Sequence, residues 1–241
     1  MLIKEEENSN MASVEELESV IEYKFQDKSL LTQALTHSSY ANEMHMGKLH
    51  DNERLEFLGD AVLEIVSSRF LYLNYPEYRE GELTKLRASL VCESTLAYCT
   101  KEIELGKYIM LAHGEEKCGG RERASILSDA FEALIGAMYL DGGMDVAGAF
   151  IEKYVLNDIE SKTLFHDCKT ALQELVQAKR DGNVEYRLVS EEGPAHDKVF
   201  ESVVVYHGKT LGKGSGHSKK NAEQQAAYQA LLNIKEGNIC I

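Results

Sequence analysis

Apolar residues recur every three or four positions along the first two thirds of the chain, which is the spacing of amphipathic helices. Ser13 and Glu16 form a capping box before one apolar stripe, and Asp27 can cap a second helix. Longer helices are predicted over residues 52–73, from about 81 through 96, over 123–140 and over 145–159. Gly142 and Gly143 separate the last two, as expected for a helix C-cap. This region is therefore predicted to be all-α.

The pattern changes in the last third. Residues 169–180 form one amphipathic stripe, 184–214 alternate with a period of two, and 218–234 return to helical spacing. Turn residues at 192–194 and 207–208 divide the alternating stretch into three strands. We therefore expect a multi-domain protein, with an all-α domain over 13–160 and a small α+β domain (α-β-β-β-α) over 167–236. The acidic residues 1–12 are expected to be a disordered tail.

The composition is that of a globular protein: 44% of the 241 residues are hydrophobic, 27% are charged and two are proline. We find no uninterrupted apolar run near the roughly 18–20 residues that span a bilayer, and no apolar signal-peptide core at the start. The five cysteines are scattered, without a C-x-x-C pair, which indicates a reducing compartment and no zinc site. We expect a cytoplasmic protein without a membrane partner.

The formal charge of −14 argues at first against a nucleic-acid partner, because phosphate binding requires lysine and arginine. The charge is unevenly distributed. Residues 1–166 hold 16 Lys/Arg against 30 Asp/Glu, whereas residues 167–241 hold 10 of each. The two predicted domains are therefore expected to have different roles.

Two of the predicted helices carry carboxylates among apolar residues on every side. Residues 55–66 contain Glu56 and Asp60, one turn apart, and residues 124–140 contain Asp129 and Glu132 as their only charges. An unpaired buried carboxylate costs several kcal/mol, and neighbouring like charges raise one another's pKa. Such acids can instead lie on exposed helix faces, or pair with arginines elsewhere. Arg54, Arg87 and Arg123 are the arginines available for such pairs.

A shared divalent cation would resolve this conflict, because oxygen-only ligands suit Mg²⁺ or Mn²⁺. Gly59 and Gly136 would let the two helices approach closely. Such a centre can polarise a phosphoryl oxygen and assist an in-line displacement.

These segments resemble those of a known enzyme family. Residues 52–63 (NERLEFLGDAVL) closely resemble the signature segment of bacterial ribonuclease III, and residues 35–40 (LTHSSY) and 128–136 (SDAFEALIG) resemble its other motifs. Similar residues also occur at 79–83 and 119–120, so the resemblance covers nearly all of residues 14–235.

The resemblance implies a ribonuclease III endonuclease domain followed by a double-stranded RNA-binding domain. By this resemblance Glu56, Asp60, Asp129 and Glu132 bind Mg²⁺ (Mn²⁺ can substitute), with Asp60 and Glu132 the most sensitive for catalysis. Glu53, Glu80 and Glu115 match further acidic positions around the family's cleft. The family acts as a homodimer on double-stranded RNA, including rRNA precursors and structured transcripts. It leaves 5′-phosphate and 3′-hydroxyl ends with a short 3′ overhang.

The last domain carries its own signal for nucleic acid. A glycine-rich turn over 212–216 leads to Lys219 and Lys220 at the start of a helix, where cations oppose the helix dipole unless an anion binds. Gln173 and Gln177 share one face of the preceding helix. The segment resembles a double-stranded RNA-binding domain, which implies RNA contacts by Gln173, Gln177, His196, Lys219 and Lys220. Such domains recognise A-form shape over about 16 bp.

Two other functions are compatible with parts of the sequence. The His-Asp dipeptides at 50–51, 166–167 and 196–197 allow a His/Asp metal phosphohydrolase, although each lies at a helix boundary or turn. A non-catalytic RNA-binding scaffold is the second alternative, and the four intact carboxylates speak against it.

Overall fold

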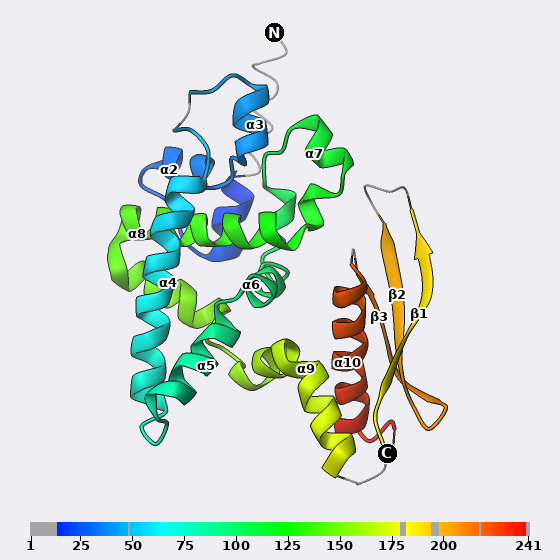
Figure 1. The fold of residues 1–241 in the computed structure, drawn as a ribbon. Helices are drawn as coiled ribbons and strands as arrows, with labels where there is room; N and C mark the ends of the chain where they lie inside the picture. Colours follow the sequence, from blue (N-terminus) through cyan, green and yellow to red (C-terminus); the bar gives the residue numbers. More distant parts are fainter. Residues whose placement is uncertain (1–13, 48, 179–181, 194–197, 217, 240–241) are drawn as a thin grey trace. The chain divides into compact units, whose positions relative to one another are not determined.

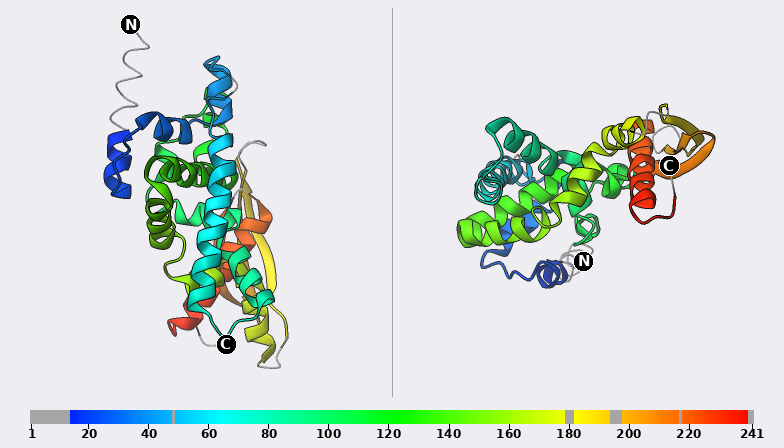
Figure 2. Two further views of the ribbon diagram at one scale, coloured as in Figure 1. Left: turned by 90° about the vertical axis from the view of Figure 1, so that its left-hand side faces the viewer. Right: turned by 90° about the horizontal axis from the view of Figure 1, so that it is seen from below.

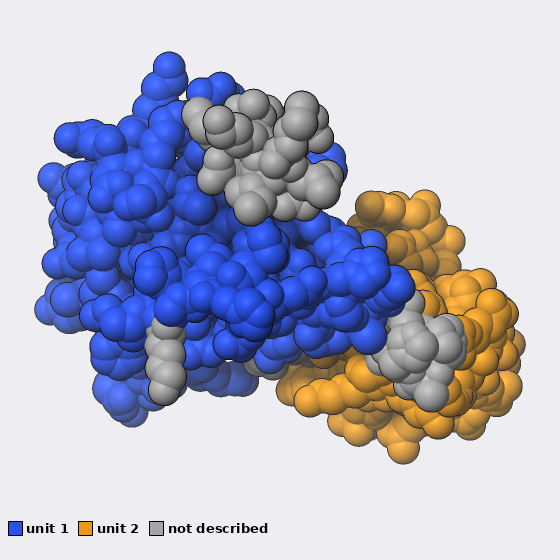
Figure 3. Space-filling model, turned by 90° about the horizontal axis from the view of Figure 1, so that it is seen from above, with its two compact units in different colours: residues 1–159 blue, residues 160–241 orange. Residues whose placement is uncertain are grey.

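The chain forms two compact units, one of residues 1–159 and one of residues 160–241 (Figure 3). The structure is a computed structural model that describes residues 14–47, 49–178, 182–193, 198–216 and 218–239. Each unit has its own hydrophobic core. The tail over 1–12 and the capping residue Ser13 lie outside the described residues.

The first unit is built from helices, as predicted (Figures 1 and 2). Residues 14–21 are helical. The elements that follow are α2 (Lys28–Ala34), α3 (Ser38–Glu43), α4 (Glu53–Asn74), α5 (Glu80–Leu90), α6 (Glu93–Cys99), the 3-10 turn η1 (Leu105–Lys107), α7 (His113–Lys117), the 3-10 turn η2 (Gly120–Glu122) and α8 (Ala124–Tyr154). The Asp27 carboxylate accepts the Ser29 N–H at the start of α2, which confirms the predicted cap.

Helix α8 forms the centre of this unit and crosses α4 (Figure 1). Phe131, Leu134 and Ile135 on α8 are fully buried, together with Leu63 on α4. By length and composition alone α8 could cross a membrane, although Asp129, Glu132 and Asp141 interrupt its apolar residues. Its burial against α4 and other helices of the unit identifies it as a core helix.

Two glycines allow α4 and α8 to touch through their backbones. A Cβ atom on Gly59 would lie 1.8 Å from the Glu132 carbonyl oxygen, and one on Gly136 would lie 2.2 Å from the Leu55 carbonyl oxygen. Neither distance leaves room for a side chain, so the close approach predicted from these glycines is confirmed. This contact sets the position of the α8 turn that carries Glu132.

Three helix boundaries differ from the prediction. The helix expected from 81 through 96 is two helices, because Cys92 is extended and Thr95 Oγ1 donates to the Ser89 carbonyl at 2.7 Å. The break expected near 142–143 is a kink inside α8, where Gly143 has φ +80°. Helix α9 (Ile159–Ala178) begins ten residues before the predicted 169.

A polar contact fixes the segment before α2 to the middle of α8. The Asp141 carboxylate accepts the Tyr23 hydroxyl at 2.6 Å, and it also accepts the backbone N–H groups of Gln26 and Asp27. Burial alone would raise the pKa of Asp141, but these hydrogen bonds outweigh it and lower the pKa. The segment before α2 is thereby tied to α8 within the first unit.

The second unit has the predicted α-β-β-β-α order. It contains most of α9, then β1 (Glu185–Glu192), β2 (Val199–Tyr206), β3 (Lys209–Gly216) and α10 (Lys219–Lys235). The strands form an antiparallel meander in the order β1-β2-β3. Its core includes Leu172 and Val176 of α9, Val204 of β2 and Ala226 of α10. Gly212 and Gly214 bring β3 directly against the α10 backbone.

Candidate functional site

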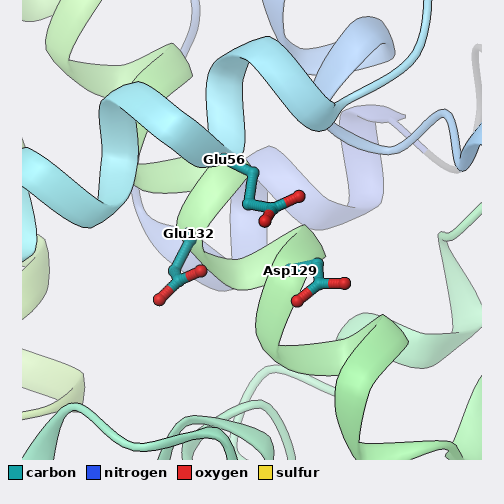
Figure 4. A group of neighbouring side chains, drawn as sticks. All are labelled: Glu56, Asp129 and Glu132. Atoms are coloured by element: carbon teal, nitrogen blue, oxygen red, sulfur yellow. The ribbon is translucent and has the colours of Figure 1, made fainter.

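Three carboxylates meet where α4 crosses α8. Glu56 comes from α4, and Asp129 and Glu132 come from α8, with their side chains grouped in one place (Figure 4). One carboxylate oxygen from each lies within 4.8 Å of those from the other two. All three side chains are half-buried, so the group is open to solvent on one side.

Burial raises the pKa of all three groups, and the charges of nearby acids add to this effect. Burial, followed by the charges of Asp60 and Glu56, raises the pKa of Glu132 to about 8. Burial and then the Asp129 charge raise the pKa of Glu56. Burial raises the pKa of Asp129, partly offset by a hydrogen bond from the Ser128 hydroxyl. The raised pKa values indicate that no nearby positive charge among the described residues fully compensates the negative charges of these carboxylates.

No lysine or arginine of the described chain pairs with these three carboxylates. Two arginines that could have done so have other partners: Arg87 binds Glu64 at 2.8 Å, and Arg123 binds Glu115. Arg54, the third, is exposed and makes no ion pair within the described residues. The structure thus excludes arginine pairing as the explanation for these acids.

The fourth predicted residue, Asp60, is not part of this group. Its side chain is exposed on α4, one turn after Glu56. It nevertheless contributes the largest charge effect on Glu132, ahead of Glu56 and Asp129. Asp60 therefore borders the site from the solvent side.

The donor set fits a hard divalent cation. It consists of carboxylate oxygens alone, which are the ligands that Mg²⁺ and Mn²⁺ prefer, and it carries excess negative charge that a cation would compensate.

In the second unit, two of the predicted lysines lie at the start of α10. The Ser218 hydroxyl caps this helix by accepting the Asn221 N–H. Lys219 lies over the Phe200 ring, with Nζ 5.8 Å from the ring centroid and 3.9 Å from Glu191 Oε2. Lys220 is exposed.

The other predicted RNA contacts are less completely described. Gln173 Nε2 donates to Asn183 Oδ1 at 2.8 Å, and Gln177 is exposed one turn later on α9. His196 lies outside the described residues.

Comparison with known proteins identifies both units. Residues 27–159 match the family model for ribonuclease-III-like domains, and residues 168–234 match the double-stranded RNA binding motif. The Ribonuclease 3 of Listeria welshimeri is 49% identical over 222 residues, covering 91% of this chain and 97% of the relative. The Ribonuclease 3 of Enterococcus faecalis is 53% identical over 214 residues, covering 88% and 93%.

The chain belongs to the ribonuclease III family. It is an endoribonuclease of that family acting on double-stranded RNA, and its second unit is a double-stranded RNA-binding domain. A non-catalytic RNA-binding scaffold is therefore excluded.

Solved ribonuclease III structures agree with this assignment. Two solved structures of the nuclease domain of Campylobacter jejuni ribonuclease III match with a TM-score of 0.54 and with 44% and 45% identity. They cover 58% of this chain and 92% and 97% of their own chains. One of them is described as containing a region involved in dimer formation.

The further acidic positions suggested by the ribonuclease III resemblance lie apart from the carboxylate group. Glu80 accepts the Thr84 hydroxyl on α5, and Glu115 pairs with Arg123. Glu53 is exposed at the start of α4, and its charge contributes to the raised pKa of Glu56.

One neighbour of the site was given no role by the sequence reasoning. His37 caps α3 by accepting the Ser39 N–H through Nδ1, and its charge lowers the pKa of Asp129. It lies in the 35–40 motif that resembles ribonuclease III, which is the signal that could have identified it.

Proposed function

We propose that this ribonuclease III-family enzyme hydrolyses double-stranded RNA with a divalent cation held by Glu56, Asp129 and Glu132, with Asp60 at its border. The observation that carries the proposal is the group of three half-buried carboxylates within 4.8 Å that lacks a lysine or arginine partner among the described residues. Mg²⁺ is the expected ion, and Mn²⁺ can substitute. When bound, the ion would polarise a phosphoryl oxygen and stabilise developing negative charge.

The four acidic side chains are proposed to have two different roles. Glu56 and Asp129 would hold the cation, one from each helix, so that the α4–α8 crossing fixes the site. Glu132 and Asp60 are expected to be the most sensitive for turnover. Glu132 is the most strongly perturbed of the three clustered acids, and Asp60 is exposed beside it, where it can face substrate.

We further propose that the enzyme works as a homodimer in which each subunit cuts one strand. Helix α4 carries an apolar stripe on its outer face: Phe57 is 80% exposed, Ile65 58% and Tyr72 72%. Their spacing places them on one side of the helix. A second copy of the chain would cover this stripe. Paired cutting would leave 5′-phosphate and 3′-hydroxyl ends with short 3′ overhangs.

The second domain is proposed to bind the RNA duplex through Gln173, Gln177, His196, Lys219 and Lys220. The exposed lysines at the start of α10 and the glutamines on α9 support this assignment. We assign residues 13–160 to the catalytic domain and 167–236 to the RNA-binding domain. rRNA precursors and other structured transcripts in the cytoplasm are the proposed substrates.

The test is to map the cut ends on a defined RNA duplex with Mg²⁺ and again after chelation. We expect staggered 5′-phosphate ends with Mg²⁺ and intact duplex in EDTA. Glu132→Ala should abolish cutting while duplex binding remains. Glu152→Ala, which removes an exposed acid from the same helix, is the matched control and should cut normally. Undiminished cutting in excess EDTA, or by Glu132→Ala, would contradict the proposed centre.

A further inference from the structure

One carboxylate lies between two lysines at the edge of the proposed RNA-binding surface. Glu191, near the end of β1, contacts Lys198 through Oε1 and lies 3.9 Å from Lys219 Nζ through Oε2. Each of its two oxygens therefore faces one ammonium group.

Three elements meet at this contact. Glu191 is on β1, Lys198 directly precedes β2, and Lys219 begins α10. Glu191 is also the register partner of Phe200 on β2, whose ring lies beneath Lys219. The strand pairing and the aromatic ring together hold the two lysines on either side of the carboxylate.

The two lysines on either side of the Glu191 carboxylate could bind a backbone phosphodiester of RNA in the same way. A backbone phosphate also presents two anionic oxygens, and ammonium groups bind it as point charges. The N-terminus of α10 adds partial positive charge next to Lys219. A phosphate and the Glu191 carboxylate cannot both occupy the space between the lysines, because they repel each other.

We propose that Lys198 and Lys219 form a phosphate-binding pair for duplex RNA, and that the Glu191 carboxylate occupies this pair in the free protein and is displaced by the RNA. The inference rests on the proposed role of Lys219 in RNA binding and adds Lys198 as a contact. Glu191 lowers the affinity of the domain for RNA, since its ion pairs are lost on binding.

The ion pairs are partly exposed, with side-chain exposures of 39% for Lys198, 33% for Glu191 and 61% for Lys219. Exposed pairs are weak and screened by salt. The effect of Glu191 should therefore be modest, largest at low ionic strength, and reversible. The lysines remain accessible to a competing anion.

The test measures binding of the full-length protein to a duplex of about 16–20 bp in EDTA, over a range of salt concentrations. Glu191→Gln should bind about 2- to 5-fold more tightly at low salt. The slope of the logarithm of its binding constant against the logarithm of salt concentration should be steeper by up to about 0.9, as expected for one additional phosphate contact. Glu185→Gln removes the same charge from the other end of β1, where Glu185 pairs with Arg187, and should change binding less.

A second comparison isolates the proposed pair. With Lys198 and Lys219 both replaced by methionine, Glu191→Gln should no longer increase the affinity. If Glu191→Gln binds no more tightly than Glu185→Gln, or if its gain persists without the two lysines, the displacement proposal is wrong. Failure of the wild-type protein to bind duplex RNA would instead contradict the proposed function, and this inference with it.

Discussion

Glu132 contributes both to the contact between α4 and α8 and to the proposed cation site. Its backbone carbonyl oxygen lies 1.8 Å from the position that a Cβ atom on Gly59 of α4 would take, and its carboxylate is one of the three that meet at the helix crossing. Burial and the neighbouring acids raise its pKa to about 8. In the absence of a cation this carboxyl is therefore largely protonated at neutral pH.

The raised pKa of Glu132 has a consequence for the stability of the metal-free protein. Because the unfolded state binds fewer protons between about pH 4.5 and pH 8, this group stabilises the fold at low pH and the contribution is lost as pH rises through 8. A divalent cation competes with these protons. We expect the rise in melting temperature produced by Mg²⁺ to grow between pH 6 and 8.5.

Thermal melting in EDTA and in Mg²⁺ across this pH range checks the prediction. Glu132→Gln, in which residue 132 is neutral at every pH, should be more stable than the wild type at pH 8 without metal. Mg²⁺ should raise its melting temperature less than that of the wild type. An Mg²⁺ effect that does not change with pH would contradict the prediction.

Reasoning from the sequence identified the acids of the site because charges inside apolar helices are conspicuous. It placed Asp60 with the other three acids, because the spacing alone does not show that Asp60 is exposed on α4 while Glu56, one turn earlier, is half-buried. The influence of His37 on Asp129 was also beyond a local pattern, because the two are far apart in the sequence.

At the scale of elements, the crossing of α4 and α8 positions the carboxylates. Its geometry depends on direct backbone contact at Gly59 and Gly136, where no side chain fits. Gly136→Ala places a methyl group 2.2 Å from the Leu55 carbonyl oxygen, so the helices must separate. We expect a loss of about 3 kcal/mol in unfolding free energy and weaker cleavage by the folded fraction.

Gly148 provides the control on the same helix. Nothing lies within 4 Å of a Cβ atom at this position, so Gly148→Ala should raise the unfolding free energy by about 0.5–1 kcal/mol through helix propensity. Chemical denaturation of both variants measures the difference. Equal stabilities for the two variants would show that the α4–α8 contact is not tight.

The types and order of the longer elements followed from hydrophobic spacing, whereas the short helices α3 and α7 and some boundaries did not. The break between α5 and α6 depends on hydrogen bonds of Ser89 and Thr95, which compete with helix continuation. Helix α9 begins at Ile159, ten residues before the amphipathic stripe that predicted it. The spacing of apolar residues shows neither where side-chain hydrogen bonds end a helix nor how far a helix continues beyond its apolar stripe.

At the scale of the whole molecule, the proposed dimer explains why α4 carries large apolar side chains on its exposed face. Phe57 is the most exposed of these, at 80%. Phe57→Asp should therefore leave the monomer fold intact and weaken self-association by about 30-fold or more, as for a central interface residue.

Light scattering coupled to gel filtration, over a range of protein concentrations, measures this effect. Val189→Asp, which changes an exposed apolar residue on β1, should not alter self-association. A wild-type protein that stays monomeric at high concentration, or a Phe57→Asp variant that dimerises normally, would contradict the proposed interface.

Contacts between distant parts of the chain were the least predictable feature. The Tyr23 hydroxyl and the Asp141 carboxylate are 118 positions apart, and neither residue has a local pattern that indicates its partner. Packing of the complete first unit brings them together. The division into two parts with different charge, by contrast, is visible in the composition alone.

That division has a consequence for how the enzyme responds to ionic strength. The nuclease part carries all the excess negative charge, so a polyanionic duplex is repelled there while the lysines of the other domain attract it. Added monovalent salt weakens the attraction and also screens the repulsion over a Debye length of about 8–10 Å. The rate of cutting at low RNA concentration should therefore pass through a maximum at intermediate salt instead of falling steadily.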